Sequence, residues 1–393
     1  MAYKNLPDLR FSEFSGKWKQ EKFNNFVKRI SETSSSNQYK KIEFSDIDSG
    51  ILKNKLRNND SKGIKFLKKD VLFGKLRPYL KNWYYCNFDG IAIGDFWVYR
   101  AKKDYSNSTF IYYLIQTEKY NLVANYTTGT KMPRSDWNIV SNTLFGLPSF
   151  NEQQKIGSFF EKLDKLIELQ TQKLDQLKKL KRGYLQKMFP QKGETVPRLR
   201  FSGFSGEWKE DRLGNYSHII GGGTPSTSND KYWNGNINWF SPIEIGKNKY
   251  VSNSTKKISD IGLKNSSAKI LPKGSLLFTS RAGIGKTAIL LKEACTNQGF
   301  QSIVPIDGRL DIEFLYAISY KLKNYGNKMG SGSTFTEVSG KTMSKMKLRL
   351  PNVNEQKKIG NFFAKLDRLI EEQSNKLDQL KQQKKAYLQK MFI

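Results

Sequence analysis

The segment SRAGIGKT, at residues 280–287, contains residue types that could bind a phosphate group. It follows the apolar run Ser275–Phe278, which we predict to be a strand, and it ends in Gly-Lys-Thr. The phosphate loop of ATPases requires G-x-x-x-x-G-K-[ST], but Ser280 stands where the first glycine should be. The other half of the chain has no matching Gly-Lys-[ST]. Ser280, Arg281, Lys286 and the glycines, which expose backbone N–H groups, therefore predict an anion-binding segment with DNA phosphate as its ligand, rather than an ATPase.

Other residues that could do chemistry are few. His218 is the only histidine, which argues against a histidine-based metal site or a repeated acid–base histidine. Cys86 and Cys295 occupy matching places in an internal repeat, and we interpret them as buried packing residues. The fragment Asp60-Ser-Lys62 matches part of a nuclease motif but is short enough to occur by chance. We therefore predict no catalytic residues, no metal and no cofactor in this chain.

Positive charge dominates the composition. The 393 residues contain 67 Lys and Arg against 36 Asp and Glu, a formal net charge of +31. Such a balance favours a polyanionic partner, with nucleic acid first. No apolar run approaches the roughly 20 residues that cross a bilayer, so no membrane contact is expected. The two cysteines and the N-terminus, which lacks an apolar signal segment, indicate the cytoplasm.

The chain repeats itself. Asn151–Phe189 and Asn354–Phe392 are identical at 28 of 39 positions without a gap. Pro7–Lys19 and Pro197–Lys209 match at 10 of 13 positions. The segments between these framing pairs diverge, which indicates two modules that do the same task on different targets. The alternative is duplication followed by drift, but drift should have eroded the helices as fast as the rest.

Each long repeated segment predicts one helix with a coiled-coil seam, because apolar residues recur at alternating steps of four and three. Asn151 and Asn354 are the expected caps. Each seam also carries one Gln and one Lys, at Gln170 and Lys181 and at Gln373 and Lys384, and such polar residues can fix register. The apolar seam residues are Ile156, Phe160, Leu163, Ile167, Leu174, Leu177, Tyr184 and Met188, and Ile359, Phe363, Leu366, Ile370, Leu377, Leu380, Tyr387 and Met391.

We expect the two helices to pair antiparallel, as rods of at most about 58 Å. The predicted fold class is α+β, with two mixed α/β domains in tandem repeat, each followed by a long helix. Expected strands include Ile91–Ile93, Phe96–Tyr99, Ser302–Val304 and Lys347–Leu350, and the expected helices of the globular parts are Ser108–Asn121 and Ile312–Lys323. Each long helix has a net charge of +4, so the remaining +23 lies outside these helices and points to the globular domains as the polyanion-binding parts.

The paired segments that begin NEQQKIGSFF and NEQKKIGNFF, together with GGGTPSTSNDKYWNGNINWFSP and SRAGIGKT, resemble the specificity subunit of type I restriction–modification enzymes. The resemblance covers essentially the whole chain. It implies a target-recognition domain at 1–150, a central helix at 151–189, a linker at 190–196, a second target-recognition domain at 197–353 and a C-terminal helix at 354–393. Each domain would read one half of a bipartite, asymmetric site in double-stranded DNA, and the antiparallel coiled coil would set the gap.

The resemblance also implies partners. Two methyltransferase subunits would methylate adenine with S-adenosylmethionine, and restriction subunits would add ATP- and magnesium-dependent translocation and cleavage. The alternatives are a coiled-coil scaffold and a basic nucleic-acid-binding protein without sequence specificity. From residue type, position in the repeat and family motif, the predicted DNA contacts are Lys75, Arg77, Tyr79, Lys131 and Arg134, and Thr224, Ser226, Lys231, Trp233, Arg281, Lys286, Ser333 and Thr334.

Overall fold

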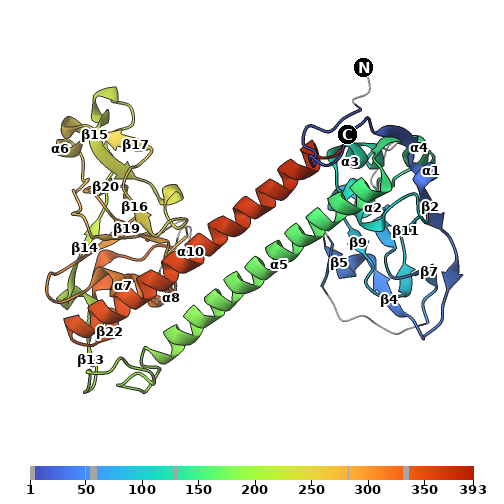
Figure 1. Cartoon of the computed structure of the whole chain (residues 1–393). Helices are drawn as coiled ribbons and strands as arrows, with labels where there is room; N and C mark the ends of the chain where they lie inside the picture. Colours follow the sequence, from blue (N-terminus) through green and yellow to red (C-terminus); the bar gives the residue numbers. More distant parts are fainter. Residues whose placement is uncertain (1–4, 49, 54–59, 127–131, 282, 331–335) are drawn as a thin grey trace. The chain divides into compact units, whose positions relative to one another are not determined.

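The computed structural model describes residues 5–48, 50–53, 60–126, 132–281, 283–330 and 336–393. The chain divides into two compact units, Met1–Gln172 with Ser374–Ile393, and Lys173–Gln373. Both units mix helices and strands, and each globular part is followed by a helix of 38 residues, α5 (Phe150–Lys187) or α10 (Val353–Lys390) (Figure 1). The division cuts both helices, because α5 and α10 each contribute residues to both units.

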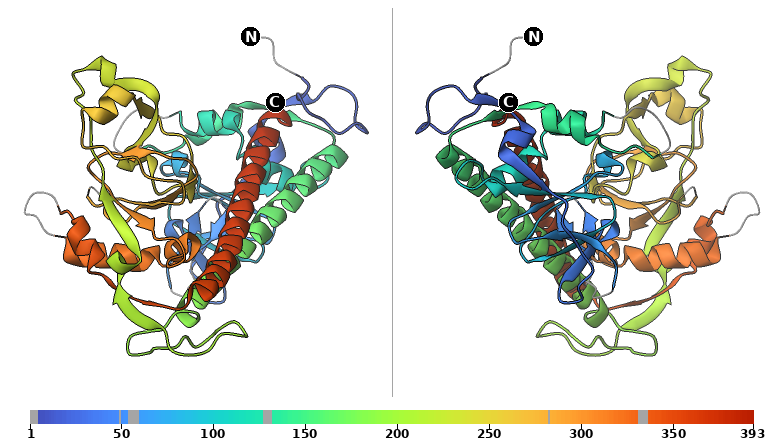
Figure 2. Two further views of the ribbon diagram at one scale, coloured as in Figure 1. Left: turned by 90° about the vertical axis from the view of Figure 1, so that its left-hand side faces the viewer. Right: turned by 90° about the vertical axis from the view of Figure 1, so that its right-hand side faces the viewer.

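The first unit contains two four-stranded sheets. One has the order β2-β11-β8-β9 and only antiparallel pairs, and the other has the order β3-β7-β10-β4 with β10 and β4 parallel. In the right-hand view of Figure 2 these blue and cyan strands face the reader. The strands are β2 (Val27–Ile30), β3 (Thr33–Ser34), β4 (Lys40–Glu43), β7 (Gly63–Phe66), β8 (Val71–Gly74), β9 (Trp83–Tyr85), β10 (Gly90–Ile93) and β11 (Phe96–Ala101).

Shorter elements complete the first unit. They are the pairs β1 (Lys19–Lys22) with β12 (Leu144–Leu147) and β5 (Ile47–Asp48) with β6 (Ile51–Leu52), and the helices α1 (Phe23–Phe26), α2 (Ser108–Leu114), α3 (Glu118–Ala124) and α4 (Trp137–Asn142). The sequence indicates one helix over 108–121, whereas the structure has two. The break follows from Thr117, whose hydroxyl oxygen accepts a hydrogen bond from Tyr120 N and so begins α3.

The second unit is built around a five-stranded sheet of order β14-β21-β18-β19-β16 and a three-stranded sheet of order β17-β15-β20. Helices α7 and α8 divide the segment predicted as a single helix at 312–323. The elements are β13 (Lys209–Arg212), β14 (Ser217–Gly221), β15 (Trp233–Phe240), β16 (Tyr250–Val251), β17 (Lys256–Ile258), α6 (Asp260–Lys264), β18 (Leu276–Phe278), β19 (Thr287–Leu290), β20 (Cys295–Thr296), β21 (Gln301–Pro305), α7 (Ile312–Ala317), α8 (Ser319–Met329), α9 (Gly340–Ser344) and β22 (Lys347–Leu350).

The expected strands at 91–93, 96–99, 302–304 and 347–350 are present as β10, β11, β21 and β22. The cap prediction for the long helices is wrong by two residues. The side chains that accept hydrogen bonds from the first helical turn are Ser149, from Glu152 N, and Asn352, from Glu355 N. A capping side chain bonds the N–H group three residues ahead, so Asn151 and Asn354 already lie inside the helices.

In both units the helix contacts run antiparallel. In the first unit Phe159 of α5 contacts Tyr387 of α10, with ring centroids 5.2 Å apart. In the second unit Tyr184 of α5 contacts Phe362 of α10 at 4.9 Å. The second contact is the repeat of the first with the helices exchanged. All sixteen apolar seam residues are buried or half-buried.

The repeated Asn-Glu-Gln motif at each helix start fastens the globular part to the helix. Glu152 accepts two hydrogen bonds of 2.7 Å from Arg10, and Glu355 accepts bonds of 2.8 and 2.7 Å from Arg200. The next glutamine in each copy accepts a hydrogen bond from the backbone in front of α2 or α7. The framing sequences are therefore similar because they build the same joint twice.

Gly157 lies inside α5, where the helix packs closely against the globular part of the first unit. A Cβ added at Gly157 would collide with the Thr109 hydroxyl, whereas at Gly183 it would meet no described atom within 4 Å. We expect Gly157→Ala to destabilise the protein by about 1–3 kcal/mol. The control Gly183→Ala should stabilise it by about 0.5–1 kcal/mol, since glycine is the poorer helix former. Urea unfolding measures both, and equal shifts of the same sign would contradict the close approach.

Candidate nucleic-acid interface

Three charged residues of the first unit meet beside the turn after β8. The Lys75 ammonium lies 3.7 Å from an Asp95 carboxylate oxygen, and the Arg134 guanidinium lies 3.1 Å from the other. Backbone bonds hold the segments together, because Lys75 N donates to Asp95 O and Ser135 N donates to Lys75 O. Of the two cations, Arg134 is the more exposed, with 57% of its side chain accessible. The cluster presents two cations and one carboxylate toward solvent.

Arg77 lies in the same turn in a left-handed backbone conformation, with φ of 48°. This conformation is costly for a residue with a Cβ, by about 1–2 kcal/mol. Arg77 N donates to Pro133 O, and Arg77 Nε is buried without a hydrogen-bond partner among the described residues. Tyr79, two residues on, is 54% exposed. The turn therefore holds an arginine with an unused donor next to an exposed aromatic ring.

SRAGIGKT is the connection of a β-hairpin. Strands β18 and β19 are antiparallel, and Thr279 N donates to Lys286 O across the turn. Gly283 and Gly285 have φ of 103° and 92°, values that suit glycine. A phosphate loop of an ATPase leads from a strand into a helix, whereas this turn leads into strand β19. The segment therefore does not have the strand–loop–helix structure of an ATPase phosphate loop.

In the second unit the turn and a neighbouring loop approach each other. Arg281 lies 3.9 Å from a Glu337 carboxylate oxygen, and Ser280 N donates to Gly299 O. One residue before Gly299, the Gln298 side chain accepts a hydrogen bond from Thr224 Oγ1. The chain therefore brings Thr224 close to the turn that carries Arg281.

Of the other predicted residues of this unit, Ser226, Lys231 and Trp233 follow Thr224 in the chain, and Lys286 is the last residue of the turn before β19. Trp233 Nε1 donates to Ser226 O at 3.0 Å, and the side chains of Ser226 and Lys231 are exposed. The exposed Lys286 runs beside Gly246. Lys131, Ser333 and Thr334 lie outside the described residues. The structure does not connect Lys231 or Lys286 with Arg281 by any described hydrogen bond or ion pair.

The two turns occupy equivalent places in their units. Ser280 in the second unit has the same backbone hydrogen-bond pattern as Lys75 in the first. Ser280 N donates to Gly299 O, and Val338 N donates to Ser280 O. Ser135 and Val338 are therefore equivalent, and so are the residues that precede them, Arg134 and Glu337. One scaffold position thus carries a cation in the first unit and an anion in the second. The sequence analysis missed Asp95, Glu337 and Gln298, because it selected cations, aromatics and hydroxyl side chains and not the carboxylates and amides that bind them.

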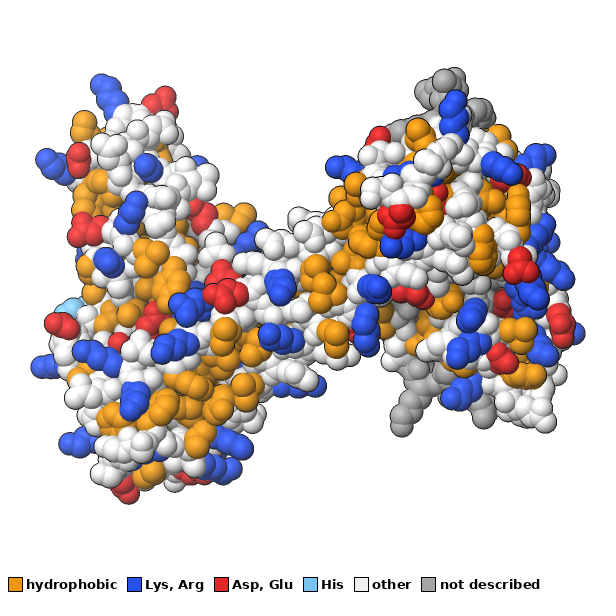
Figure 3. Space-filling model, viewed as in Figure 1, with side chains coloured by type: hydrophobic (Ala, Val, Ile, Leu, Met, Phe, Trp, Pro, Cys, Tyr) orange, Lys and Arg blue, Asp and Glu red, His pale blue; other side chains and the backbone are white. Residues whose placement is uncertain are grey.

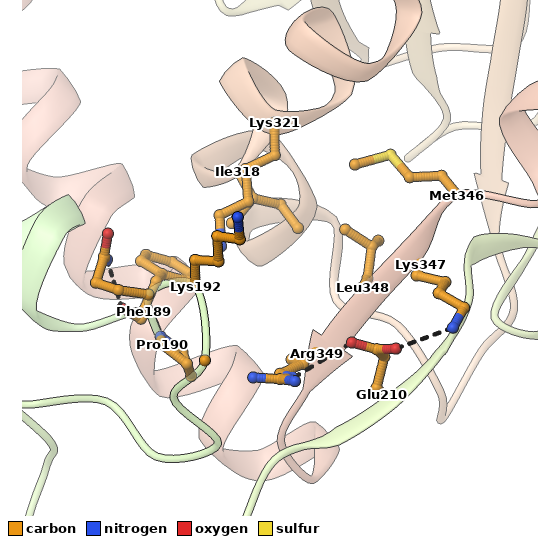
Figure 4. A pocket seen from close by; sticks show the side chains of 12 residues that line it. Phe189, Pro190, Lys192, Glu210, Ile318, Lys321, Met346, Lys347, Leu348 and Arg349 are labelled. Carbon is orange, nitrogen blue, oxygen red and sulfur yellow. Dashed lines mark hydrogen bonds and ion pairs between the residues drawn. The ribbon is translucent and has the colours of Figure 1, made fainter. Parts of the chain in front are cut away.

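Lysine and arginine side chains are spread over the described surface of both units on the face drawn in Figure 3. A pocket of about 300 Å³ in the second unit is lined by Lys192, Lys321, Lys347 and Arg349 together with Glu210 (Figure 4). Glu210 lies 3.2 Å from Lys347 and 3.4 Å from Arg349, and burial lowers the pKa of Lys321. None of the predicted DNA contacts that the structure describes lines this pocket.

Other reactive groups are buried or solitary. Cys86 and Cys295 are fully buried, and burial raises the pKa of both thiols, that of Cys295 to about 11. Within the described residues no cluster of three or more His, Cys, Asp or Glu could hold a metal ion. In the same residues no helix combines the length and apolar character needed to cross a membrane.

The profile of the family described as "Type I restriction modification DNA specificity domain" matches residues 17–179 and 205–382. The two matches cover most of the chain, one in each half, and the chain therefore belongs to this family. Members of this family are specificity subunits without catalytic activity of their own.

Among curated relatives, the type I restriction enzyme MjaIX specificity subunit of Methanocaldococcus jannaschii is 36% identical over 169 residues. That alignment covers 42% of this chain and only 39% of the relative. The HindI specificity subunit of Haemophilus influenzae is 22% identical over 88% of this chain and 94% of its own length. A solved type I restriction-modification S subunit from M. genitalium shares the fold, with a TM-score of 0.66, 14% identity and 99% coverage of both chains.

Proposed function

We propose that this chain is the DNA-recognition subunit of a type I restriction–modification complex. The recognition domains are 1–150 and 197–353, followed by the helices 151–189 and 354–393 respectively, and the linker 190–196 connects the first helix to the second domain. Each domain reads one part of a two-part target in double-stranded DNA. The observation that carries the proposal is one backbone scaffold that occurs in both units, in which the segment bonded to the turn carries Arg134 in the first unit and Glu337 in the second. Side chains of opposite charge at equivalent positions favour different DNA sequences.

The chemistry belongs to the partners in this proposal. Two methyltransferase subunits bind this chain and transfer a methyl group from S-adenosylmethionine to adenine, and restriction subunits supply the step that uses ATP and magnesium. The chain acts where the DNA is, in the cytoplasm. Antiparallel helix contacts in both units support a spacer that separates the two readers.

Mapping methylated adenines in cells with and without this chain tests the proposal. We expect one bipartite motif that disappears when the chain is absent. Exchanging Lys75 and Arg134 for alanine should relax or weaken only the half-site of the first unit, since a lost base contact costs about 1–3 kcal/mol at one position. The matched control is Lys347→Ala, an exposed cation of the second unit outside the predicted contacts. Methylation or DNA binding without sequence preference, with the partner subunits present, would instead support a scaffold that does not read DNA.

A further inference from the structure

The apolar seam by itself does not define how the helices are aligned. Apolar residues recur every seven residues in both helices, so a slip of one heptad would again place apolar residues opposite apolar ones. A slip of seven residues would move one helix along the other by roughly 10 Å. Polar groups at defined seam positions can exclude such alternatives. The lysines of the seam, Lys181 and Lys384, are therefore the residues to inspect.

In the first unit the seam lysine bridges three elements. The Lys384 ammonium, on α10, lies 2.6 Å from Asp164 Oδ1, on α5. It also donates to Gln116 Oε1 at 3.3 Å and lies 5.4 Å from the centre of the Tyr113 ring. The Tyr113 hydroxyl, on α2, donates to Asp164 Oδ2 at 3.0 Å. Burial and the Asp164 charge raise the pKa of Tyr113, so this hydroxyl stays a donor.

In the second unit the same residue types meet with the helices exchanged. The Lys181 ammonium, on α5, lies 2.5 Å from Asp367 Oδ1, on α10. Lys249, with only 10% of its side chain exposed, adds a contact of 3.1 Å to Asp367 and one of 2.7 Å to Glu313. Its ammonium lies 4.6 Å from the centre of the Tyr316 ring. Tyr316, Asp367 and Lys181 are the repeat partners of Tyr113, Asp164 and Lys384.

Each bridge joins both long helices to the globular part of its unit. The carboxylates are half-buried, with 33% of Asp164 and 16% of Asp367 exposed, so losing the lysine leaves an incompletely solvated charge. A heptad slip would separate both pairs at once, because the contacts require one alignment. The apolar seam holds the helices together. The aromatic residue after each long helix adds to the alignment, since Phe392 packs on Phe110 and Phe160, and Phe189 packs on Phe314 and Phe363. Within the seam itself, the two bridges distinguish the observed alignment from its neighbours.

We propose that the Asp164–Lys384 and Asp367–Lys181 bridges are positioning contacts that select the register of helix pairing and thereby the gap of the DNA target. The second part rests on the proposed function. A heptad slip of roughly 10 Å corresponds to about three base pairs at 3.4 Å each. The bridges thus restrict the complex to one gap length.

Spin labels test the register without DNA. Lys162→Cys and Gln383→Cys place labels on exposed positions of α5 and α10 in the first unit, and the native cysteines are fully buried. Pulsed electron resonance should give one distance in this background. We expect the further double change Asp164→Asn with Asp367→Asn to add a second distance, displaced by roughly 10 Å.

Glu168→Gln with Glu372→Gln is the matched control, because it removes the same charge from exposed ion pairs on the same helices. This control should keep the single distance. The exchange of Asp164 with Lys384, which reverses the bridge, should keep it as well, whereas Asp164→Lys alone should not. A folded Asn double variant, checked by circular dichroism, that retains one unchanged distance overturns the register proposal.

The effect of helix register on the gap of the DNA target is measured in a separate experiment. In the complex with its partners, the Asn double variant should methylate targets whose gap differs by about three base pairs from the wild-type gap. A second helix distance with an unchanged gap overturns the link between register and target. Failure of the proposed function is distinguishable, because the wild-type complex would then show no sequence-specific methylation while the spin-label distances still decide the register.

Discussion

The affinity of the complex for DNA is expected to fall by about 10³–10⁵ between 50 and 200 mM salt, for about six to ten phosphate contacts. The reason is the release of counterions when lysine and arginine neutralise phosphates. The net charge of +31, of which +23 lies outside the long helices, supplies the cations. Titration of labelled DNA at several salt concentrations measures the slope of log K against log salt.

Variants that lose a phosphate contact and variants that lose a base contact should differ in their salt dependence. Removing one phosphate contact, for example with Lys286→Ala, should weaken binding to all sequences and reduce the slope by about 1. A residue that contacts only a base should instead change the preference at one position with little change in slope. An affinity that is the same at both salt concentrations would contradict electrostatic binding through the globular units.

Glu355→Ala is expected to destabilise the second unit by about 3–5 kcal/mol, because it leaves the Arg200 guanidinium without its buried partner. Glu355 is fully buried, and only 14% of the Arg200 side chain is exposed. The same guanidinium also donates to Ser205 O and Gly206 O, so its loss of position would release the loop that precedes β13. Urea unfolding followed by tryptophan fluorescence measures the change.

Glu210→Ala is the control for this prediction. Glu210 also pairs with two cations, Lys347 and Arg349, but 43% of its side chain is exposed. An exposed pair contributes about 0–1 kcal/mol, so the control should change stability little. Equal and small effects of both variants would mean that the buried joint does not hold the globular part to the helix start.

The long helices could be predicted from the sequence, because heptad spacing is a local pattern that any stable helix must bury. Their first turns could not be placed as accurately. Asn151 and Asn354 have suitable side chains, but Ser149 and Asn352 make the capping bonds. Likewise Thr117 divides α2 from α3 through one side-chain hydrogen bond, which competes with a continuous helix that the apolar pattern alone favours.

Among the predicted contact residues, too, some associations follow from the sequence and others only from the fold. Lys75 and Arg77 are neighbours in sequence, and their association needed no structure. Asp95 and Arg134 reach the same turn from 20 and 59 residues beyond Lys75, so only strand pairing could bring them together. The register role of Lys181 and Lys384 was visible as polar seam positions, but their carboxylate partners on the opposite helix were not.

The sequence by itself determined that the chain contains two copies of one plan, two long helices and no repeated catalytic set, because these follow from residue identity and local spacing. The tertiary structure decided that SRAGIGKT closes a hairpin, that equivalent positions beside the two turns carry Arg134 in one unit and Glu337 in the other, and that each seam lysine meets an aspartate and a globular unit. Those facts depend on backbone hydrogen bonds and ion pairs between distant segments, and no local pattern specifies them.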